Sequence, residues 1–225
     1  MIDKLLIDLD GTVLDFSKGE RNAFILTVKK FTEYEPTDFD CEKFSVINEF
    51  YFNEYRTGKM DRNTFHHNRF KDIFEYLKLN ADIDESDNYY VDSLKYQAIL
   101  YDDVIDALKY LSKKYELYVA SNGMTEVQKK RLELAGVDKY FKKSYVSEEL
   151  GHNKPEIEFF DYIFNDLNDF DKSHYAIIGD RLESDILGGF NAGITTIYLE
   201  RCEMTCDEVK PDYKISSLNE INKIL

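Results

Sequence analysis

Cysteine is scarce in this sequence, and its scarcity excludes one way of stabilising a fold. Only three cysteines are present, Cys41, Cys202 and Cys206. An odd and sparse set argues against a disulfide scaffold and is typical of a reducing compartment. Cys202 and Cys206 have three residues between them and no second ligand pair nearby, so we interpret both as reduced thiols rather than as a zinc site.

Long apolar runs are also missing. No stretch approaches the length that crosses a membrane, and the first residues lack the basic-then-apolar pattern of an export signal. We therefore expect a cytoplasmic protein with no membrane partner. Internal repeats, low-complexity segments and Pro/Gly-rich linkers are absent too, so the 225 residues are expected to form one large domain or two modest ones.

Positive charge is in short supply. The chain has 29 lysines and arginines against 44 aspartates and glutamates, which gives a formal net charge of −15. An acidic surface repels phosphate backbones and argues against DNA or RNA as a partner. A small phosphorylated metabolite remains compatible, because a bound cation can invert the local field. We expect a monomer or a homodimer.

Two acidic residues close to the N-terminus follow a short apolar run. The run at residues 5–7 leads into Asp8-Leu9-Asp10-Gly11-Thr12, which is typical of a buried strand that ends in a sharp turn. Side chains alternate along a strand, so Asp8 and Asp10 start out on the same face. Two like charges so close are costly unless a cation or a shared proton lies between them. Their oxygens favour a hard cation such as Mg²⁺.

The next part of the chain predicts helices only. Residues 15–97 show apolar positions at helical spacing and no strand pattern, which indicates a four-helix bundle. The expected helix signals are a capping box at Ser17 and Glu20, a helix over residues 41–57 that stops at Gly58, and starts at Asp61 and Asp84.

From about residue 100 strand and helix patterns alternate. Strands are predicted at residues 117–120, 144–147, 175–178 and 195–199; helices are predicted at residues 104–114 and 125–135, from Pro155 onward, and up to about Ala192. Such alternation favours a doubly wound α/β fold with a parallel, Rossmann-like sheet covered on both faces. The first strand has no partner among the helices. We therefore expect a core of residues 1–14 and 98–225, with residues 15–97 inserted as a helical domain.

Four strand ends or loops carry polar side chains that suit one chemistry. Beside Asp8 and Asp10, the sequence offers Ser121, Lys154 and the pair Asp180 and Asp185, listed here in chain order. Active sites of open α/β sheets lie beyond the carboxyl ends of the strands. Carboxylates suit a hard cation, whereas a hydroxyl and a lysine suit the oxygens of an anion. One carboxylate can attack phosphorus while another moves a proton.

These residues resemble the signatures of the haloacid dehalogenase-like (HAD) hydrolase superfamily. The matching positions, in order, are Asp8-Leu9-Asp10-Gly11-Thr12, Ser121, Lys154-Pro155, and Asp180 with Asp185. Each signature is weak alone, but the four in sequence are specific and span nearly the whole chain. The resemblance implies a phosphomonoester hydrolase that works through an aspartyl-phosphate, with the helical insertion as a cap that closes over the site.

The resemblance also implies a role for each matching residue. Asp8 would attack phosphorus, and Asp10 would protonate the leaving oxygen and then activate water. Mg²⁺ would be held by Asp8, Asp180 and the backbone carbonyl of Asp10, and Asp185 would support it directly or through water. The substrate phosphate would be bound by Gly11, Thr12, Ser121, Asn122 and Lys154. Lys154 would also temper the charge on Asp8.

Several short segments of the sequence resemble one branch of this superfamily, the noncanonical pyrimidine 5′-nucleotidases. The similar segments are Ser121-Asn122-Gly123-Met124-Thr125-Glu126-Val127-Gln128 with Arg131-Leu132, Ser147-Glu148-Glu149-Leu150-Gly151, and Asp185-Ile186-Leu187-Gly188-Gly189. The branch implies a pyrimidine nucleoside 5′-monophosphate as substrate. Arg181 departs from the branch, where a small residue is more usual, and we interpret its side chain as solvated. We interpret His152 as a loop residue without a catalytic role.

Three other functions remain open. A small phosphosugar or phosphoglycolate phosphatase, or a phosphosugar mutase, would use the same chemistry. A 2-haloacid dehalogenase would act on carbon, but Asp10 argues against it because that branch needs neither this second acid nor Mg²⁺. A non-catalytic binding protein is disfavoured by the intact set of carboxylates.

Overall fold

Strands and helices separate along the chain into two units. The computed structural model describes residues 1–201 and 209–225. Residues 1–15 and 98–225 form one unit, and residues 16–97 form the other. Cys202 and Cys206, interpreted from the sequence as reduced thiols, lie outside the described residues. Among the helices of the described part, none is long and apolar enough to cross a membrane.

The first unit contains every strand of the described residues, and the second contains helices α1 to α4. The strands are β1 Lys4–Ile7, β2 Glu116–Ser121, β3 Lys143–Val146, β4 Tyr175–Gly179, β5 Thr195–Leu199 and β6 Tyr213–Ile215. The helices are α1 Phe16–Phe31, α2 Asp38–Arg56, α3 Arg62–Leu77, α4 Ile83–Leu94, α5 Val104–Leu111, α6 Thr125–Ala135, α7 Ser147–Leu150, α8 Ile157–Asp166 and α9 Leu187–Ala192. Short 3₁₀ or π turns lie at Asp138–Tyr140, Lys172–His174, Leu182–Ile186 and Leu218–Lys223.

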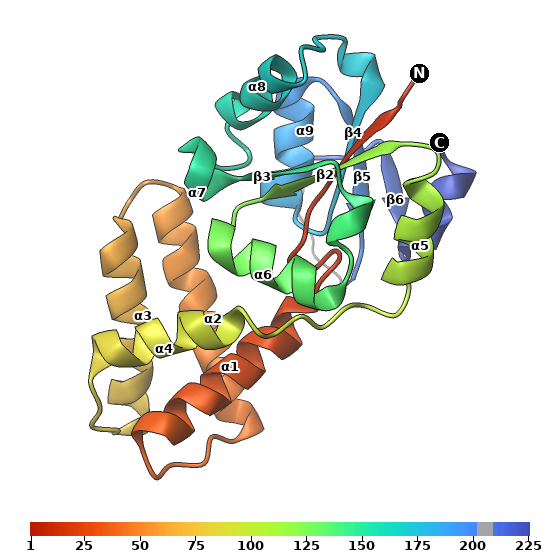
Figure 1. The fold of residues 1–225 in the computed structure, drawn as a ribbon. Helices are drawn as coiled ribbons and strands as arrows, with labels where there is room; N and C mark the ends of the chain where they lie inside the picture. Colours follow the sequence, from red (N-terminus) through yellow and green to blue (C-terminus); the bar gives the residue numbers. More distant parts are fainter. Residues whose placement is uncertain (202–208) are drawn as a thin grey trace. The chain divides into compact units, whose positions relative to one another are not determined.

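The six strands form one parallel sheet in the order β3-β2-β1-β4-β5-β6 (Figure 1). The strand β1 therefore lies at the centre, and the chain winds outward from it in both directions. Ile7 is in register with Val119 of β2 and with Ile178 of β4. The residues that follow these three strands consequently emerge side by side at one edge of the sheet, where a doubly wound fold places its ligands.

Alternation along the strands builds a hydrophobic core on each face of the sheet. Leu5 and Ile7 pack on the face that α5 covers, whereas Leu6 packs on the face that α8 covers. Aromatic rings of α8, including Phe159 and Phe160, fill the second core. Both faces are thus buried, as near-continuous apolar strands of a parallel sheet require. The predicted doubly wound α/β fold is confirmed.

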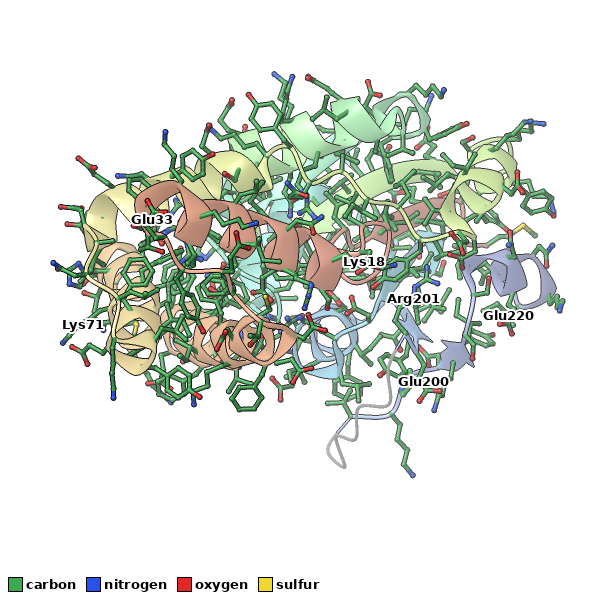
Figure 2. All side chains as sticks on the ribbon, turned by 90° about the horizontal axis from the view of Figure 1, so that it is seen from below. Lys18, Glu33, Lys71, Glu200, Arg201 and Glu220 are labelled. Carbon is green, nitrogen blue, oxygen red and sulfur yellow. The ribbon has the colours of Figure 1, made fainter. Side chains whose placement is uncertain are left out.

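The helical unit is built around one aromatic side chain from each of its helices. Phe24 of α1 stacks on Phe44 of α2 at 4.3 Å between ring centroids. Phe70 of α3 and Tyr90 of α4 each lie 5.3 Å from the ring of Phe44. Charged residues such as Lys18 and Lys71 occupy the outer surface of these helices (Figure 2).

The predicted capping box at the start of the first helix is wrong. The helix α1 begins at Phe16, so Ser17 lies within it rather than before it. Glu20 is buried and accepts a hydrogen bond from Nδ2 of Asn48 at 2.7 Å. The Glu20 carboxylate, which the sequence pattern placed in a capping box, therefore forms a hydrogen bond between α1 and α2 instead.

Two other helix starts are earlier than predicted. The helix α2 begins at Asp38, and its capping box joins Thr37 to Asp40. The start of α4 is capped by Asp82 rather than by Asp84. The start at Asp61 is confirmed, because its carboxylate accepts a hydrogen bond from the backbone of Thr64.

Two helix boundaries and one strand illustrate where the sheet-forming unit differs from the predictions. Pro155 lies in the turn before α8, which begins at Ile157. The helix α5 ends at Leu111 rather than at Lys114. The strand β6 has no counterpart in the predictions, since it is short, lies at the edge and exposes two of its three residues.

Candidate active site

Neighbouring strand ends bring the predicted carboxylates together. Asp8 directly follows β1, and its backbone N–H donates to the carbonyl of Ile178 in β4 at 2.9 Å. This bond extends the ladder past the strand and holds Asp8 beside the end of β4. Asp180 is the first residue after β4, and Asp185 lies in the π turn that follows. Three carboxylates separated by up to 177 positions in the sequence thus meet at one edge of the sheet.

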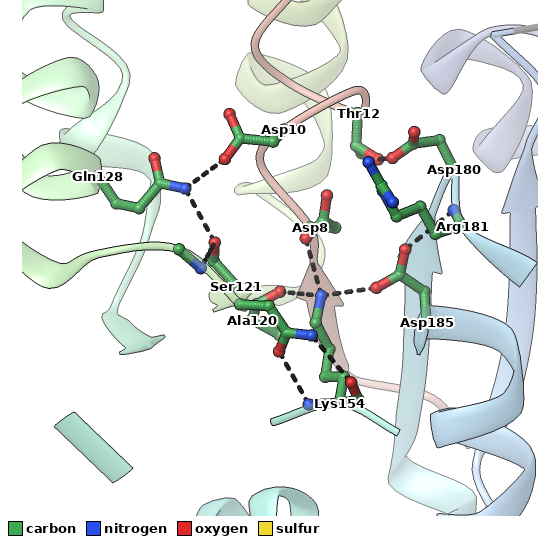
Figure 3. Close-up of polar contacts among 12 residues, drawn as sticks. Asp8, Asp10, Thr12, Ala120, Ser121, Gln128, Lys154, Asp180, Arg181 and Asp185 are labelled. Atoms are coloured by element: carbon green, nitrogen blue, oxygen red, sulfur yellow. Dashed lines mark hydrogen bonds and ion pairs between the residues drawn. The ribbon is translucent and has the colours of Figure 1, made fainter. Parts of the chain in front are cut away.

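Lys154 bridges two of these carboxylates, Asp8 and Asp185 (Figure 3). Its Nζ donates to Oδ1 of Asp8 at 2.7 Å and to Oδ1 of Asp185 at 2.6 Å, and it also donates to the carbonyl of Ala120. The side chain is only 1% exposed. The Asn122 side chain forms two hydrogen bonds with the Lys154 backbone. Its Nδ2 donates to the Lys154 carbonyl, and its Oδ1 accepts from the Lys154 N–H, both at 2.8 Å.

The electrostatics of the group call for more positive charge than Lys154 supplies. Burial raises the pKa of Asp8 well above its ordinary range; the Lys154 charge opposes this shift, and the charges of Asp185 and Asp180 add to it. Burial, with the charge of Asp185, raises the pKa of Asp180 to about 7. The pKa of Lys154 is raised, because its two carboxylates outweigh the effect of burial. The neighbouring cations, Lys154 beside Asp8 and Arg181 near Asp180, therefore do not fully offset the burial and mutual repulsion of these two carboxylates.

This donor set fits a hard divalent cation. Oxygens of Asp8, Asp180 and Asp185 all lie within 4.8 Å of one another. Carboxylate oxygens are the ligands that Mg²⁺ prefers, and a cation among them would relieve their mutual repulsion. The fit therefore rests on both the chemistry of the donors and their electrostatic deficit. The predicted fourth ligand, Asp10, remains a prediction.

Two glycines let the carboxylates approach the backbone closely. A Cβ atom on Gly11 would lie 2.1 Å from Oδ2 of Asp180, and Gly11 has a φ of +89°. A Cβ atom on Gly179 would lie 2.2 Å from Oδ2 of Asp185. Any side chain at either position would displace a carboxylate. Thr12 further fixes Asp180, since its hydroxyl donates to Oδ1 at 3.0 Å.

The remaining predicted site residues differ in their surroundings. Ser121 is buried at the end of β2, and its Oγ accepts from the N–H of Gly123 at 3.1 Å. Arg181 is partly buried rather than fully solvated, and its charge acts on Asp180 to lower the pKa of that carboxyl. His152 is exposed and contacts Glu156 at 3.1 Å. The phosphate-binding roles predicted for Gly11, Thr12, Ser121 and Asn122 remain predictions.

Asp10 has two partners that the sequence did not single out for a role. Arg131 forms an ion pair with Oδ1 of Asp10, and Gln128 donates to Oδ2 at 2.5 Å. Both belong to α6, where positions three apart share a helix face. That spacing is the signal that could have drawn attention to them, although it does not identify Asp10 as their partner.

Known proteins resemble this chain over nearly its whole length. A family model described as haloacid dehalogenase-like hydrolase matches residues 2–193. YfnB from Bacillus subtilis, described as a HAD-hydrolase, is 32% identical, and the alignment covers 98% of this chain and 94% of YfnB. The crystal structure of YfnB bound to magnesium covers 100% of this chain and 98% of that chain, with a TM-score of 0.93.

Two further relatives have named substrates. The pyrimidine 5′-nucleotidase YjjG from Escherichia coli is 27% identical and covers 99% of this chain and 97% of its own length. The N-acylneuraminate-9-phosphatase of Mus musculus is 28% identical, covering 98% of this chain and 92% of its own length. Relatives at similar identity thus carry names of both nucleotide and sugar-phosphate enzymes.

Proposed function

The chain belongs to the haloacid dehalogenase-like hydrolases, and on that premise we propose that it is a Mg²⁺-dependent phosphomonoester hydrolase. The observation that carries the proposal is the group of three carboxylates, Asp8, Asp180 and Asp185, two of which form ion pairs with the buried Lys154. Mg²⁺ held by Asp8, Asp180 and Asp185 would neutralise charge on the phosphoryl oxygens. The helical unit, inserted at residues 16–97, is proposed as the cap of this enzyme.

The proposed reaction has two displacements at phosphorus. In the first, the Asp8 oxygen that Lys154 does not hold attacks phosphorus, and the bond to the leaving oxygen breaks as that oxygen takes a proton from Asp10. In the second, Asp10 accepts a proton from water, whose oxygen attacks the aspartyl-phosphate. This step releases phosphate and restores the Asp8 carboxylate. Lys154 and Ser121 would bind the phosphoryl oxygens throughout.

The proposed substrate is a pyrimidine nucleoside 5′-monophosphate. The resemblance to YjjG over the full chain supports it. A small sugar phosphate is the second candidate, supported by the resemblance to N-acylneuraminate-9-phosphatase at nearly the same identity.

A panel of monophosphates tests both candidates. We expect phosphate release from pyrimidine 5′-nucleotides, with kcat/KM at least about tenfold above that for sugar phosphates. Good turnover of a sugar phosphate without activity on nucleotides would replace the first candidate by the second. Treatment with EDTA should abolish turnover, and Mg²⁺ should restore it. Halide release from a 2-haloacid that persists in EDTA would instead identify a dehalogenase.

Cation binding should also affect stability in a pH-dependent way. The pKa of Asp180 is raised from 3.8 to about 7, and that of Asp8 is raised as well. At these two groups the metal-free folded state therefore binds more protons than the unfolded chain between about pH 4 and pH 7, so their contribution to its stability declines as the pH rises through this window. Lys154 stays charged throughout, because its pKa is raised.

The expected result is a melting temperature of the metal-free protein that is lower at pH 8 than at pH 5. Saturating Mg²⁺ should raise it by several degrees at pH 8 and by less at pH 5, where protons compete for the carboxylates. Thermal melts in EDTA and in Mg²⁺ at both pH values measure this. An Mg²⁺ shift that is equal at the two pH values, or larger at pH 5, would contradict it.

A further inference from the structure

A buried polar pair on α6 is directed at the proposed proton-transfer residue. Gln128 and Arg131 are each only 1% exposed. A buried arginine is costly unless its charge is paired and hydrogen-bonded. The partner here is Asp10, whose side chain is 28% exposed and lies in the loop after β1.

The contacts hold both oxygens of the Asp10 carboxylate. Arg131 Nη1 donates to Oδ1, and Gln128 Nε2 donates to Oδ2. The same Nε2 donates to Oγ of Ser121 at 3.0 Å, and Figure 3 shows the contacts of this amide nitrogen with Asp10 and Ser121. Oε1 of Gln128 accepts from Arg131 at 3.2 Å. One amide therefore joins the proposed acid–base residue to the proposed phosphate-binding serine.

The turn after Ser121 leaves room for this amide. A Cβ atom on Gly123 would lie 2.3 Å from Nε2 of Gln128. Asn122 and Gly123 connect β2 to α6, so the turn that positions Ser121 also admits the Gln128 side chain.

We propose that Gln128 and Arg131 are positioning residues that fix the Asp10 carboxyl group relative to Ser121 and hence to the leaving oxygen. The inference rests on the proposed function, in which Asp10 transfers the proton. Two donors on two oxygens leave the carboxylate one orientation, and misplacement of a catalytic group by even about 1 Å can cost on the order of a hundredfold in rate.

Substitutions of Arg131 and Gln128 test the proposal, because the loss in kcat/KM should depend on whether the leaving group needs a proton. Arg131→Met and Gln128→Met should each lower kcat/KM for an alkyl monophosphate about tenfold to a hundredfold. The loss should be several-fold smaller for p-nitrophenyl phosphate, whose leaving group needs no protonation. Arg131→Lys, which keeps one donor, should restore part of the activity. Lys129→Gln, at an exposed position of the same helix, should match the unmodified enzyme.

A double-mutant cycle with Asp10→Asn completes the test. Single-turnover phosphorylation by p-nitrophenyl phosphate should be no slower in the Asp10→Asn/Arg131→Met double variant than in Asp10→Asn alone. Thermal melts establish that each variant is folded. Equal losses for both leaving groups, or a loss from Arg131→Met that is undiminished in the Asp10→Asn background, would overturn the proposal. Full activity of Asp10→Asn itself would instead overturn the acid–base role in the proposed function.

Discussion

Asp8→Asn is expected to abolish turnover, with a fall in kcat of at least about 10⁴-fold. The amide has the shape of the carboxylate but is not a nucleophile towards phosphorus. It keeps an oxygen that can accept from Lys154, so the variant should fold. The loss is then chemical rather than structural.

Two measurements separate these causes. Phosphate release is followed in Mg²⁺ with the best substrate of the panel, and trapping of Asp8 by a fluoride mimic of the phosphoryl group is followed by mass or spectroscopy. Both signals should vanish in Asp8→Asn. They should persist in Asp161→Asn, a matched change at an exposed aspartate of α8 in the same unit. Turnover that survives in Asp8→Asn would show that the nucleophile is assigned wrongly.

Much of the sheet-forming unit could be predicted from the sequence, because each strand is marked by a short apolar run. An apolar run ending in Asp8, and another ending shortly before Asp180, indicate parallel strands whose carboxyl ends share an edge. The rule needs no knowledge of the loops between them. The resemblance to the haloacid dehalogenase-like hydrolases is confirmed for the same reason, since its signatures occupy these strand ends.

The side-chain contacts between distant parts of the chain could not be predicted, because no local sequence pattern encodes them. Glu20 stands where a capping box needs it, yet it turns to Asn48 of a neighbouring helix. Arg131 lies 121 positions from Asp10, and only the fold brings them together. Neither the length nor the charge of a side chain states which partner it will meet. The family resemblance suggests which residues react, but it does not suggest a role for Gln128 or Arg131.

Lys154→Met is expected to remove both activity and stability. Without the ammonium, Asp8 and Asp185 are left as buried carboxylates with no cation between them. Removing one partner of a buried ion pair costs about 3–5 kcal/mol in the free energy of unfolding. The loss in stability should be largest in EDTA at pH 8 and smaller at pH 5, because Asp8, with its raised pKa, can take up a proton there.

Mg²⁺ distinguishes the two roles proposed for this lysine. A cation among the carboxylates supplies the missing charge, so denaturant unfolding of Lys154→Met in saturating Mg²⁺ should recover part of the lost stability. Turnover should stay at least about 10³-fold down, since the proposed donor to the phosphoryl oxygens is still missing. Lys113→Met, at an exposed lysine after α5, should change neither quantity. If the free energy of unfolding of Lys154→Met in EDTA at pH 8 equals that of the unmodified protein, the proposed electrostatic role of Lys154 is wrong. If Mg²⁺ restores the turnover of Lys154→Met, the positive charge alone explains the role of the lysine, and the proposed hydrogen bond to the phosphoryl oxygens is wrong.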